Sequence, residues 1–166
     1  FVIHVGRITN ANLLTKTATI ITIAGKNRCS GAIGRDLHQL DGDIASEDPY
    51  FKKIQHLNVS SHFLIKRKGE LIQFVSCHKR AWHAGASSWK DVNNCNDFSV
   101  GIELEGSDIM KYEDIQYEVL IKLIKSLYES YPIEDIVGHN DISPGRKTDP
   151  GKFFDWNIIK SEGFNV

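Results

Sequence analysis

The chain has 166 residues, 41% of them hydrophobic and 25% charged, which is ordinary for one globular domain with a real core. A formal net charge of −1 gives no electrostatic case for binding nucleic acid or an anionic membrane surface. No apolar run approaches the roughly 20 residues that span a membrane. The three cysteines, Cys29, Cys77 and Cys95, show no disulfide or zinc-binding spacing, and their odd number favours a reducing compartment.

The first half of the chain predicts strands and only short helices. The β-branched run Thr17–Ala24 predicts a strand. Residues 32–40 predict a short helix, and residues 50–56 predict a helical turn or a short helix. Residues 62–66 and 70–75 are separated by a Lys-Gly turn and predict a β-hairpin.

The second half contains the clearest helix. Residues 112–131 place apolar side chains at a period of 3.6 residues, and Pro132 ends the pattern. Before it, residues 87–97 predict a long polar loop and residues 98–105 an alternating strand; after it, residues 133–138 predict a short strand. Residues 153–159 are expected to close the domain. This order predicts one α/β domain over residues 1–166, with a central mixed β-sheet flanked by helices.

The run from Gly138 to Gly151 has the strongest chemical pattern. It places His139 and Asp149 ten residues apart and Lys147 two residues before the aspartate, while prolines and glycines break any helix or strand between them. A loop can therefore bring an imidazole, a carboxylate and an ammonium to one point. That set suits a zinc hydrolase, with two metal ligands and a cation that stabilises an oxyanion. A purely structural loop, built from common turns, is the alternative.

Two acidic residues share one face of the strand at residues 98–105. Glu103 and Glu105 lie two residues apart, so both belong to the same side of the sheet. A polar cleft is one interpretation, in which one carboxylate acts as general base toward a metal-bound water. An exposed strand edge is the other.

Three further residues are candidates for the walls of a site. Trp82 and His83 precede Ala84 and Gly85, whose small side chains let the backbone approach another group closely. An aromatic ring beside a histidine suits a sugar-and-amide site, although a packed Trp with a solvated His fits equally. His62 begins a predicted strand, where a histidine is more often structural than a ligand.

Several runs resemble the AmpD-type N-acetylmuramoyl-L-alanine amidases, which belong to a zinc amidase family that includes bacteriophage lysozyme-type amidases and peptidoglycan recognition proteins. Together the matching runs cover about Asp48 to Trp156 in the right order, and four separate motifs agree at once. These motifs are 58–62 (NVSSH), 79–85 (KRAWHAG), 95–106 (CNDFSVGIELEG) and 138–151 (GHNDISPGRKTDPG), and the run 154–156 (FDW) near the end fits too.

The resemblance implies a catalytic role for the loop and strand residues. His139 and Asp149 would be zinc ligands, Glu103 would activate or orient the zinc-bound water, and Lys147 would stabilise the tetrahedral oxyanion. Bound zinc brings its water to a pKa of roughly 7. A carboxylate then takes the proton and returns it to the leaving amine.

The resemblance also implies a substrate and a setting. His62, Trp82 and His83 would line the cleft. The substrate would be the amide between N-acetylmuramic acid and the L-alanine of the stem peptide, typically in a 1,6-anhydro muropeptide salvaged in the cytoplasm. The expected partner is thus a small muropeptide, bound by a monomer without nucleic acid or membrane. The absence of a visible export signal and the odd cysteine count fit that compartment.

The first 30 residues depart from the family pattern. The family's third zinc ligand is a His at the end of an early strand, expected near Thr17–Ala24, yet no His stands between His4 and His38. Phe1-Val2-Ile3-His4 fits the motif, but lies further before His62 than expected. Three interpretations stay open: His4 is the ligand, with an inserted loop; the N-terminal segment is altered, for example by a reading-frame error; or the ligand is lost.

A smaller departure concerns the peptide. Asn58 and Asn94 stand where many AmpD-type members have a basic residue, which could pair with carboxylates of the stem peptide. Two other functions therefore remain beside the soluble amidase. One is a zinc-free muropeptide-binding protein on the same fold, favoured by the missing early His and disfavoured by Glu103 and Lys147. The other is a lytic amidase that acts on intact cell wall.

Overall fold

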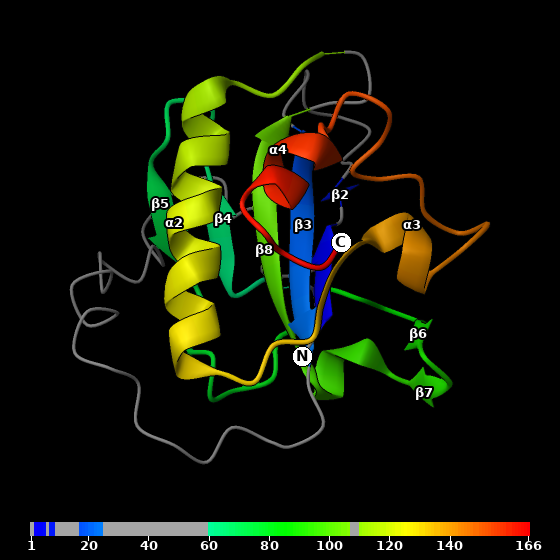
Figure 1. Ribbon diagram of the computed structural model, residues 1–166. Helices are drawn as coiled ribbons and strands as arrows, with labels where there is room; N and C mark the ends of the chain where they lie inside the picture. Colours follow the sequence, from blue (N-terminus) through cyan, green and yellow to red (C-terminus); the bar gives the residue numbers. More distant parts are fainter. Residues whose placement is uncertain (1, 6, 9–16, 25–59, 107–109) are drawn as a thin grey trace.

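The computed structural model describes residues 60–106 and 110–166 with their side chains, and residues 2–5, 7–8 and 17–24 as backbone strands. A seven-stranded sheet runs through it in the order β2-β3-β9-β1-β8-β4-β5, with helices packed on it (Figure 1). Its strands are β1 (Val2–Val5), β2 (Arg7–Ile8), β3 (Thr17–Ala24), β4 (Phe63–Ile65), β5 (Leu71–Gln73), β8 (Ser99–Gly106) and β9 (Asp135–Gly138).

Parallel and antiparallel pairs occur together in this sheet. β8 pairs in parallel with β1 and β4, whereas β4 and β5 form the predicted antiparallel hairpin. The prediction of a mixed α/β sheet flanked by helices is therefore confirmed, as are the strands at residues 17–24, 98–105 and 133–138 to within two residues. The short helices predicted at residues 32–40 and 50–56 lie outside the described residues.

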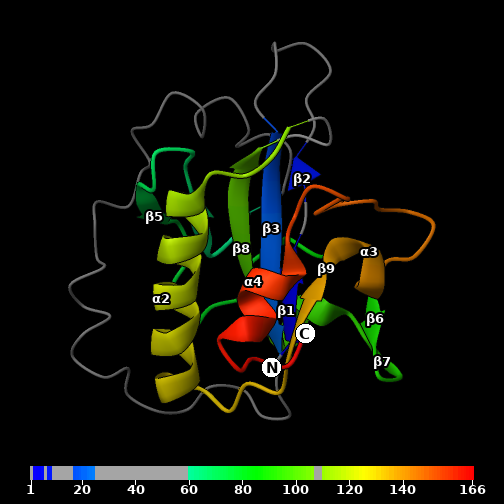
Figure 2. The ribbon, with the colours of Figure 1, turned by 45° about the horizontal axis from the view of Figure 1, so that its top comes forward.

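Helices α2 (Asp114–Ser130) and α4 (Trp156–Ser161) lie side by side over one face of the sheet (Figures 1 and 2). The predicted 3.6-residue period explains the inner face of α2, and the Glu113 backbone N–H donates to the Gln116 side chain in a capping box at its start. Between helix and sheet lies a fully buried apolar core: Phe63, Ile65, Val100, Ile102, Leu104, Leu120, Leu123, Ile124 and Leu127.

The alternation of β8 separates this core from a polar face. Val100, Ile102 and Leu104 belong to the core under α2, and the residues between them belong to the other side of the strand. Gly101 and Glu103 are thus presented on the face that the two helices do not cover. This alternation positions the candidate site.

The two N-terminal segments have registers against the same residues of the sheet. β1 aligns His4 with Gly101 of β8 and Val137 of β9 in parallel. β3 aligns Thr22 with the same two residues in the antiparallel sense. His4 and Thr22 therefore lie opposite the same two residues. One is Gly101, two positions before Glu103, and the other is Val137, two positions before His139.

The polar segment 87–97 was predicted to be a loop, and this prediction is wrong. It contains a two-stranded ribbon, β6 (Ser88–Trp89) and β7 (Val92–Asn93), followed by the short 3-10 helix η3 (Cys95–Asp97). A turn at Lys90 and Asp91, both with positive φ, joins the strands. The ribbon is held by tertiary contacts instead of an apolar pattern, because Trp89 Nε1 and Lys90 Nζ both donate to the Asp135 carboxylate.

A four-residue helix, α3 (His139–Ile142), lies where turn formers were expected to exclude one. The first of those turn formers is Pro144, so nothing prevents a single turn before it. The Gly138 N–H donates to the Asp141 carboxylate at 2.7 Å, which caps this turn. Within the described residues, no helix is long and apolar enough to cross a membrane.

Candidate active site

His139 and Asp149 face one another across the loop that follows β9. The ring Nδ1 of His139 lies 3.1 Å from Oδ2 of Asp149, and each side chain is 2% exposed. The Asn140 N–H donates to the Asp149 carbonyl at 3.0 Å and closes the loop. At the other side, the Tyr112 hydroxyl donates to the carbonyl of Pro150 and ties the loop to the start of α2.

The 3.1 Å separation of the two atoms is that of a hydrogen bond, and it is also short enough for both atoms to bind one metal ion. Donors at 2.0–2.2 Å from a tetrahedral zinc are separated by roughly 3.3 Å, close to the observed separation of Nδ1 and Oδ2. Among residues 60–106 and 110–166, no group of three or more His, Cys, Asp or Glu side chains is placed to hold a metal. The described residues therefore offer His139 and Asp149 as a pair of candidate donors, without a third such side chain beside them.

Glu103 is the other carboxylate of the site. It is 1% exposed, and neither of its oxygens accepts a hydrogen bond from the described residues. Burial first, and then the negative charge of Asp149, raise the pKa of Glu103 to about 8, although a contact with the Ser61 hydroxyl and the charge of Lys147 act in the opposite direction. A buried acid with so little hydrogen bonding is costly for folding, which marks Glu103 as a candidate functional group.

Lys147 supplies positive charge to this centre. Its side chain is half-buried, and its charge lowers the pKa of both Glu103 and His139. Burial is the main cause of the lowered pKa of His139, and its contact with Asp149 acts in the opposite direction. The ring of His139 is therefore neutral at pH 7, the form in which an imidazole binds a metal.

His62 lies at the start of β4 with every polar atom of its ring bonded to backbone. Its Nδ1 accepts from the Gly101 N–H at 3.0 Å, so Nε2 carries the proton and donates to the Lys79 carbonyl at 3.0 Å. Its own backbone N–H donates to the Gly101 carbonyl. Burial lowers the pKa of His62 to about 4. The ring thus extends the pairing of β4 with β8.

His83 packs beside it in a second buried ring. The two imidazole centroids are 5.6 Å apart, edge to face, and a Cβ on Gly101 would lie 2.5 Å from the His83 ring. The backbone N–H groups of His83 and Ala84 both donate to the Asn96 side-chain oxygen, at 2.9 and 2.8 Å. Burial first, and then the charges of His62 and His139, hold the pKa of His83 well below its usual value.

Trp82 is the exposed member of the predicted set. Its side chain is 57% exposed, and the Arg80 guanidinium lies 3.6 Å from the ring centroid. Arg80 is held in turn by Asp97 at 2.5 Å. A flat, exposed indole of this kind can stack on a sugar ring.

The structure brings together most of the predicted site residues. His139, Asp149, Glu103 and Lys147 interact at one centre, as the sequence spacing predicted for the loop. His62 and His83 form a buried layer, whereas Trp82 faces solvent. The side chain of His4 lies outside the described residues, and only its backbone register against Gly101 is given.

Two residues with contacts in this region were not among the predicted ones. Arg146 reaches within 3.4 Å of His139 Nε2, and Asn96 fixes the backbone of the Trp82–Gly85 segment. Arg146 is adjacent to Lys147, so the basic pair was visible in the sequence. Asn96 has no comparable signal, because an asparagine in a polar segment is most simply interpreted as part of a turn.

A comparison with family models matches residues 36–152 to the N-acetylmuramoyl-L-alanine amidase family. Over 110 residues the chain is 52% identical to the 1,6-anhydro-N-acetylmuramyl-L-alanine amidase AmpD of Escherichia coli K12, covering 65% of this chain and 60% of that protein. It is 37% identical over 126 residues to the N-acetylmuramoyl-L-alanine amidase AmiD of the same strain, covering 65% of this chain and 46% of AmiD.

Solved structures give the same relationship. A selenomethionine derivative of AmpD matches with a TM-score of 0.62 at 49% identity, over 72% of this chain and 68% of that one. AmpDh3 from Pseudomonas aeruginosa, in complex with an anhydromuramic pentapeptide, matches with a TM-score of 0.60 at 30% identity, over 70% and 56%. The chain spans about 60% of the length of the AmpD relatives that it matches.

Proposed function

Because the chain belongs to the N-acetylmuramoyl-L-alanine amidase family, we propose that it hydrolyses the amide between N-acetylmuramic acid and the L-alanine of a stem peptide. The substrate form that we propose is the 1,6-anhydro muropeptide of peptidoglycan recycling, which is supported by the names of the relatives that are about half identical. The observation that carries the proposal is the buried Glu103 carboxylate, without hydrogen bonds from the described residues, near the His139–Asp149 pair.

The residues that would hold a zinc ion are His139, through Nδ1, and Asp149, through Oδ2. Their separation of 3.1 Å and the neutral state of the imidazole support this assignment. His4 is the proposed third ligand, supported by its backbone position opposite Val137, two residues before His139. A zinc ion so held supplies a Lewis acid that polarises the amide carbonyl and acidifies water.

Glu103 is the proposed general base and acid. It would take a proton from the attacking water and return that proton to the leaving amine of L-alanine. A pKa of about 8 supports this role, because such a carboxyl can both accept and release a proton near neutral pH. Its burial also keeps bulk water away from the reacting atoms.

Lys147 is the proposed oxyanion-stabilising cation. The carbonyl oxygen of the amide becomes negative as water adds, and a fixed ammonium stabilises it most where solvent is partly excluded. The half-buried position of Lys147 and the effect of its charge on Glu103 and His139 support this role. Trp82, whose ring is exposed, would stack on the sugar, and the buried His83 would line the cleft.

The cellular setting is part of the same proposal. We place the reaction in the cytoplasm, catalysed by a monomer on a small diffusible muropeptide without nucleic acid or membrane. The odd number of cysteines, of which Cys77 and Cys95 are buried, fits a reducing compartment.

The test is product analysis with defined substrates. Wild-type protein would be incubated with 1,6-anhydro-N-acetylmuramyl tripeptide. The products would be separated by chromatography and identified by mass spectrometry. Free tripeptide and anhydro-N-acetylmuramic acid are expected, with activity lost after chelation and restored by zinc. Intact muropeptide after prolonged incubation in zinc-replete buffer would refute the proposal. Release of peptide from intact sacculi at a similar rate would instead indicate a lytic amidase.

The second candidate is a muropeptide-binding protein without zinc. It is favoured by one observation: the described residues supply only two metal ligands. Calorimetric titration with the same muropeptide separates the two functions, because a binder gives a stable complex and no free peptide even when zinc is present.

A further inference from the structure

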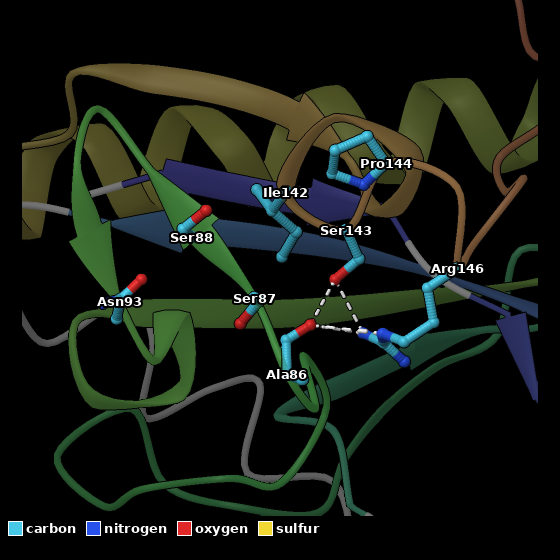
Figure 3. Close-up of a pocket in the computed structure, with 8 residues that line it drawn as sticks. All are labelled: Ala86, Ser87, Ser88, Asn93, Ile142, Ser143, Pro144 and Arg146. Atoms are coloured by element: carbon cyan, nitrogen blue, oxygen red, sulfur yellow. Dashed lines mark hydrogen bonds between the residues drawn. The ribbon is translucent and has the colours of Figure 1, made fainter.

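Arg146 holds two segments of the site together. Its Nη2 atom lies 2.7 Å from the carbonyl of Ala84, 2.9 Å from that of Ala86 and 2.6 Å from Oγ of Ser143. Its Nε also donates to Ala86, at 3.2 Å. The Ser143 hydroxyl donates to the same Ala86 carbonyl at 2.7 Å, so the three groups form one closed network (Figure 3).

The backbone at Gly85 is shaped to admit this guanidinium. Gly85 has a φ of +60°, a conformation that L side chains rarely adopt. A Cβ at this position would lie 3.2 Å from both terminal nitrogens of Arg146. The small residues after His83 predicted a close approach by another group, and Arg146 is that group.

The same carbonyl that Arg146 binds also receives His139. Nε2 of His139 lies 3.2 Å from the Ala84 carbonyl, while Nδ1 on the opposite edge of the ring faces Asp149. A histidine that binds a metal through one nitrogen is commonly oriented through the other, by a carbonyl or carboxylate. The Ala84 carbonyl is therefore placed to fix the direction of the His139 ring.

We propose that Arg146 is a positioning residue for His139, which it orients by holding the Ala84 carbonyl against the Nε2 edge of the ring. The contacts run from Arg146 to the Ala84 carbonyl and from that carbonyl to His139, and Nη2 of Arg146 also lies 3.4 Å from Nε2 of His139 itself. This proposal rests on the proposed function only for its catalytic meaning, because the contacts themselves involve no metal or substrate.

An open cavity of about 350 Å³ lies beside Arg146. Its polar lining includes Ser143, the Ala86 backbone and Arg146, and these groups already bond to one another (Figure 3). A ligand entering there would have to compete with these internal hydrogen bonds. The network is thus occupied in holding the Ala84–Ala86 segment onto α3.

The test compares Arg146→Met with a matched arginine variant in metal-free protein. Arg67 also donates through its guanidinium to a backbone carbonyl, that of Lys111, so Arg67→Met is the control. The readout is the ring ¹H–¹³C spectrum of the histidines. In Arg146→Met the His139 signals are expected to shift or broaden while those of His62 and His83 stay in place, and Arg67→Met should leave all three unchanged.

A second readout is zinc affinity, measured by competition with a chromophoric chelator well below the melting temperature. Loss of a group that orients a ligand typically weakens metal binding by about 10–100-fold. Arg146→Lys, which keeps the charge but not the planar fork, should recover part of that loss.

Unmoved His139 signals in Arg146→Met, or equal movement of His62 and His83, would overturn the proposal and leave Arg146 as general scaffolding. These signals are read without metal or substrate. A wild-type protein that cleaves no muropeptide would therefore refute the proposed function and still leave the positioning role to be decided by the spectra.

Discussion

Two buried titratable groups on the same face of the sheet near Gly101, His62 and Glu103, differ in their hydrogen bonding. His62 is buried with both ring nitrogens bonded to backbone, at Gly101 and Lys79. Glu103 lies on β8, two residues after Gly101, and is equally buried. Its oxygens nevertheless accept no hydrogen bond of ordinary geometry from the described residues. A buried histidine with hydrogen bonds to both ring nitrogens stabilises the fold. A buried acid without such hydrogen bonds lowers stability, and such groups are typical of functional sites. The comparison therefore separates structural from catalytic groups.

The largest expected effect is the loss of kcat in the variant Glu103→Gln. This change keeps the shape of the side chain and removes the proton acceptor, so kcat should fall about 10³-fold with little change in KM. Steady-state kinetics on the anhydro-muropeptide measure it. Glu105→Gln is the matched control on the same strand face, since Glu105 already accepts a hydrogen bond from the Arg67 backbone N–H. Equal losses in both variants would remove the distinction between the two carboxylates.

Lys147→Met should come next in size. Removing one group that stabilises an oxyanion costs on the order of 10²–10³ in kcat. Lys152, an exposed lysine a few residues further on, gives the control variant Lys152→Met, which should keep wild-type kcat. A Lys147→Met enzyme whose KM rises at constant kcat would reassign Lys147 to substrate binding.

Glu103 should also leave a signature in the pH dependence of stability. Its pKa of about 8 in the folded metal-free protein lies above the unfolded value of 4.5, so the folded state binds the proton more tightly. Its contribution is then fully present below about pH 4.5 and is lost as the pH rises through 8. Across that window the free energy of unfolding should fall by on the order of 5 kcal/mol more in wild type than in Glu103→Gln.

Urea unfolding of the metal-free proteins at a series of pH values measures this difference. A wild-type curve that runs parallel to that of Glu103→Gln would mean that Glu103 is solvated or hydrogen-bonded in solution, and the contrast with His62 would disappear.

His62→Ala should show the reverse behaviour to Glu103→Gln. It removes two hydrogen bonds and leaves the Gly101 N–H and the Lys79 carbonyl without partners, at a cost of about 2–3 kcal/mol in the free energy of unfolding. Below the unfolding transition its kcat should stay near wild type. His78→Ala, at an exposed histidine, is the control. A rise in KM without loss of stability would restore the sequence prediction that His62 lines the cleft.

The sequence predicted the site residues that lie close together in the chain. It missed the residues whose partners lie far away in the chain. His139, Lys147 and Asp149 lie in one run, so their meeting follows from a short loop. The β6–β7 ribbon was missed because Trp89 and Lys90 are held by Asp135, which lies more than 40 positions later in the chain. Arg146 was missed as a positioning residue for a similar reason, since its partners Ala84 and Ala86 lie about 60 residues earlier in the chain.

The N-terminal part shows a different limit. Hydrophobic and β-branched residues predicted the strand Thr17–Ala24 correctly, because that pattern depends on local sequence alone. The residue pattern of the sequence left open whether His4 or another residue is the third zinc ligand. The backbone gives His4 and Thr22 equivalent positions against Gly101 and Val137, and only one of these side chains is an imidazole.

The zinc content of the purified protein, determined by elemental analysis after dialysis in zinc-replete buffer, tests the central claim most directly. The account predicts about one zinc per chain in wild type and in the control His78→Ala, and almost none in His139→Ala, Asp149→Ala and His4→Ala. Zinc retained by His4→Ala alone would move the third ligand elsewhere. A wild-type protein without zinc, or His139→Ala with a full equivalent, would contradict the claim that His139 and Asp149 hold the metal.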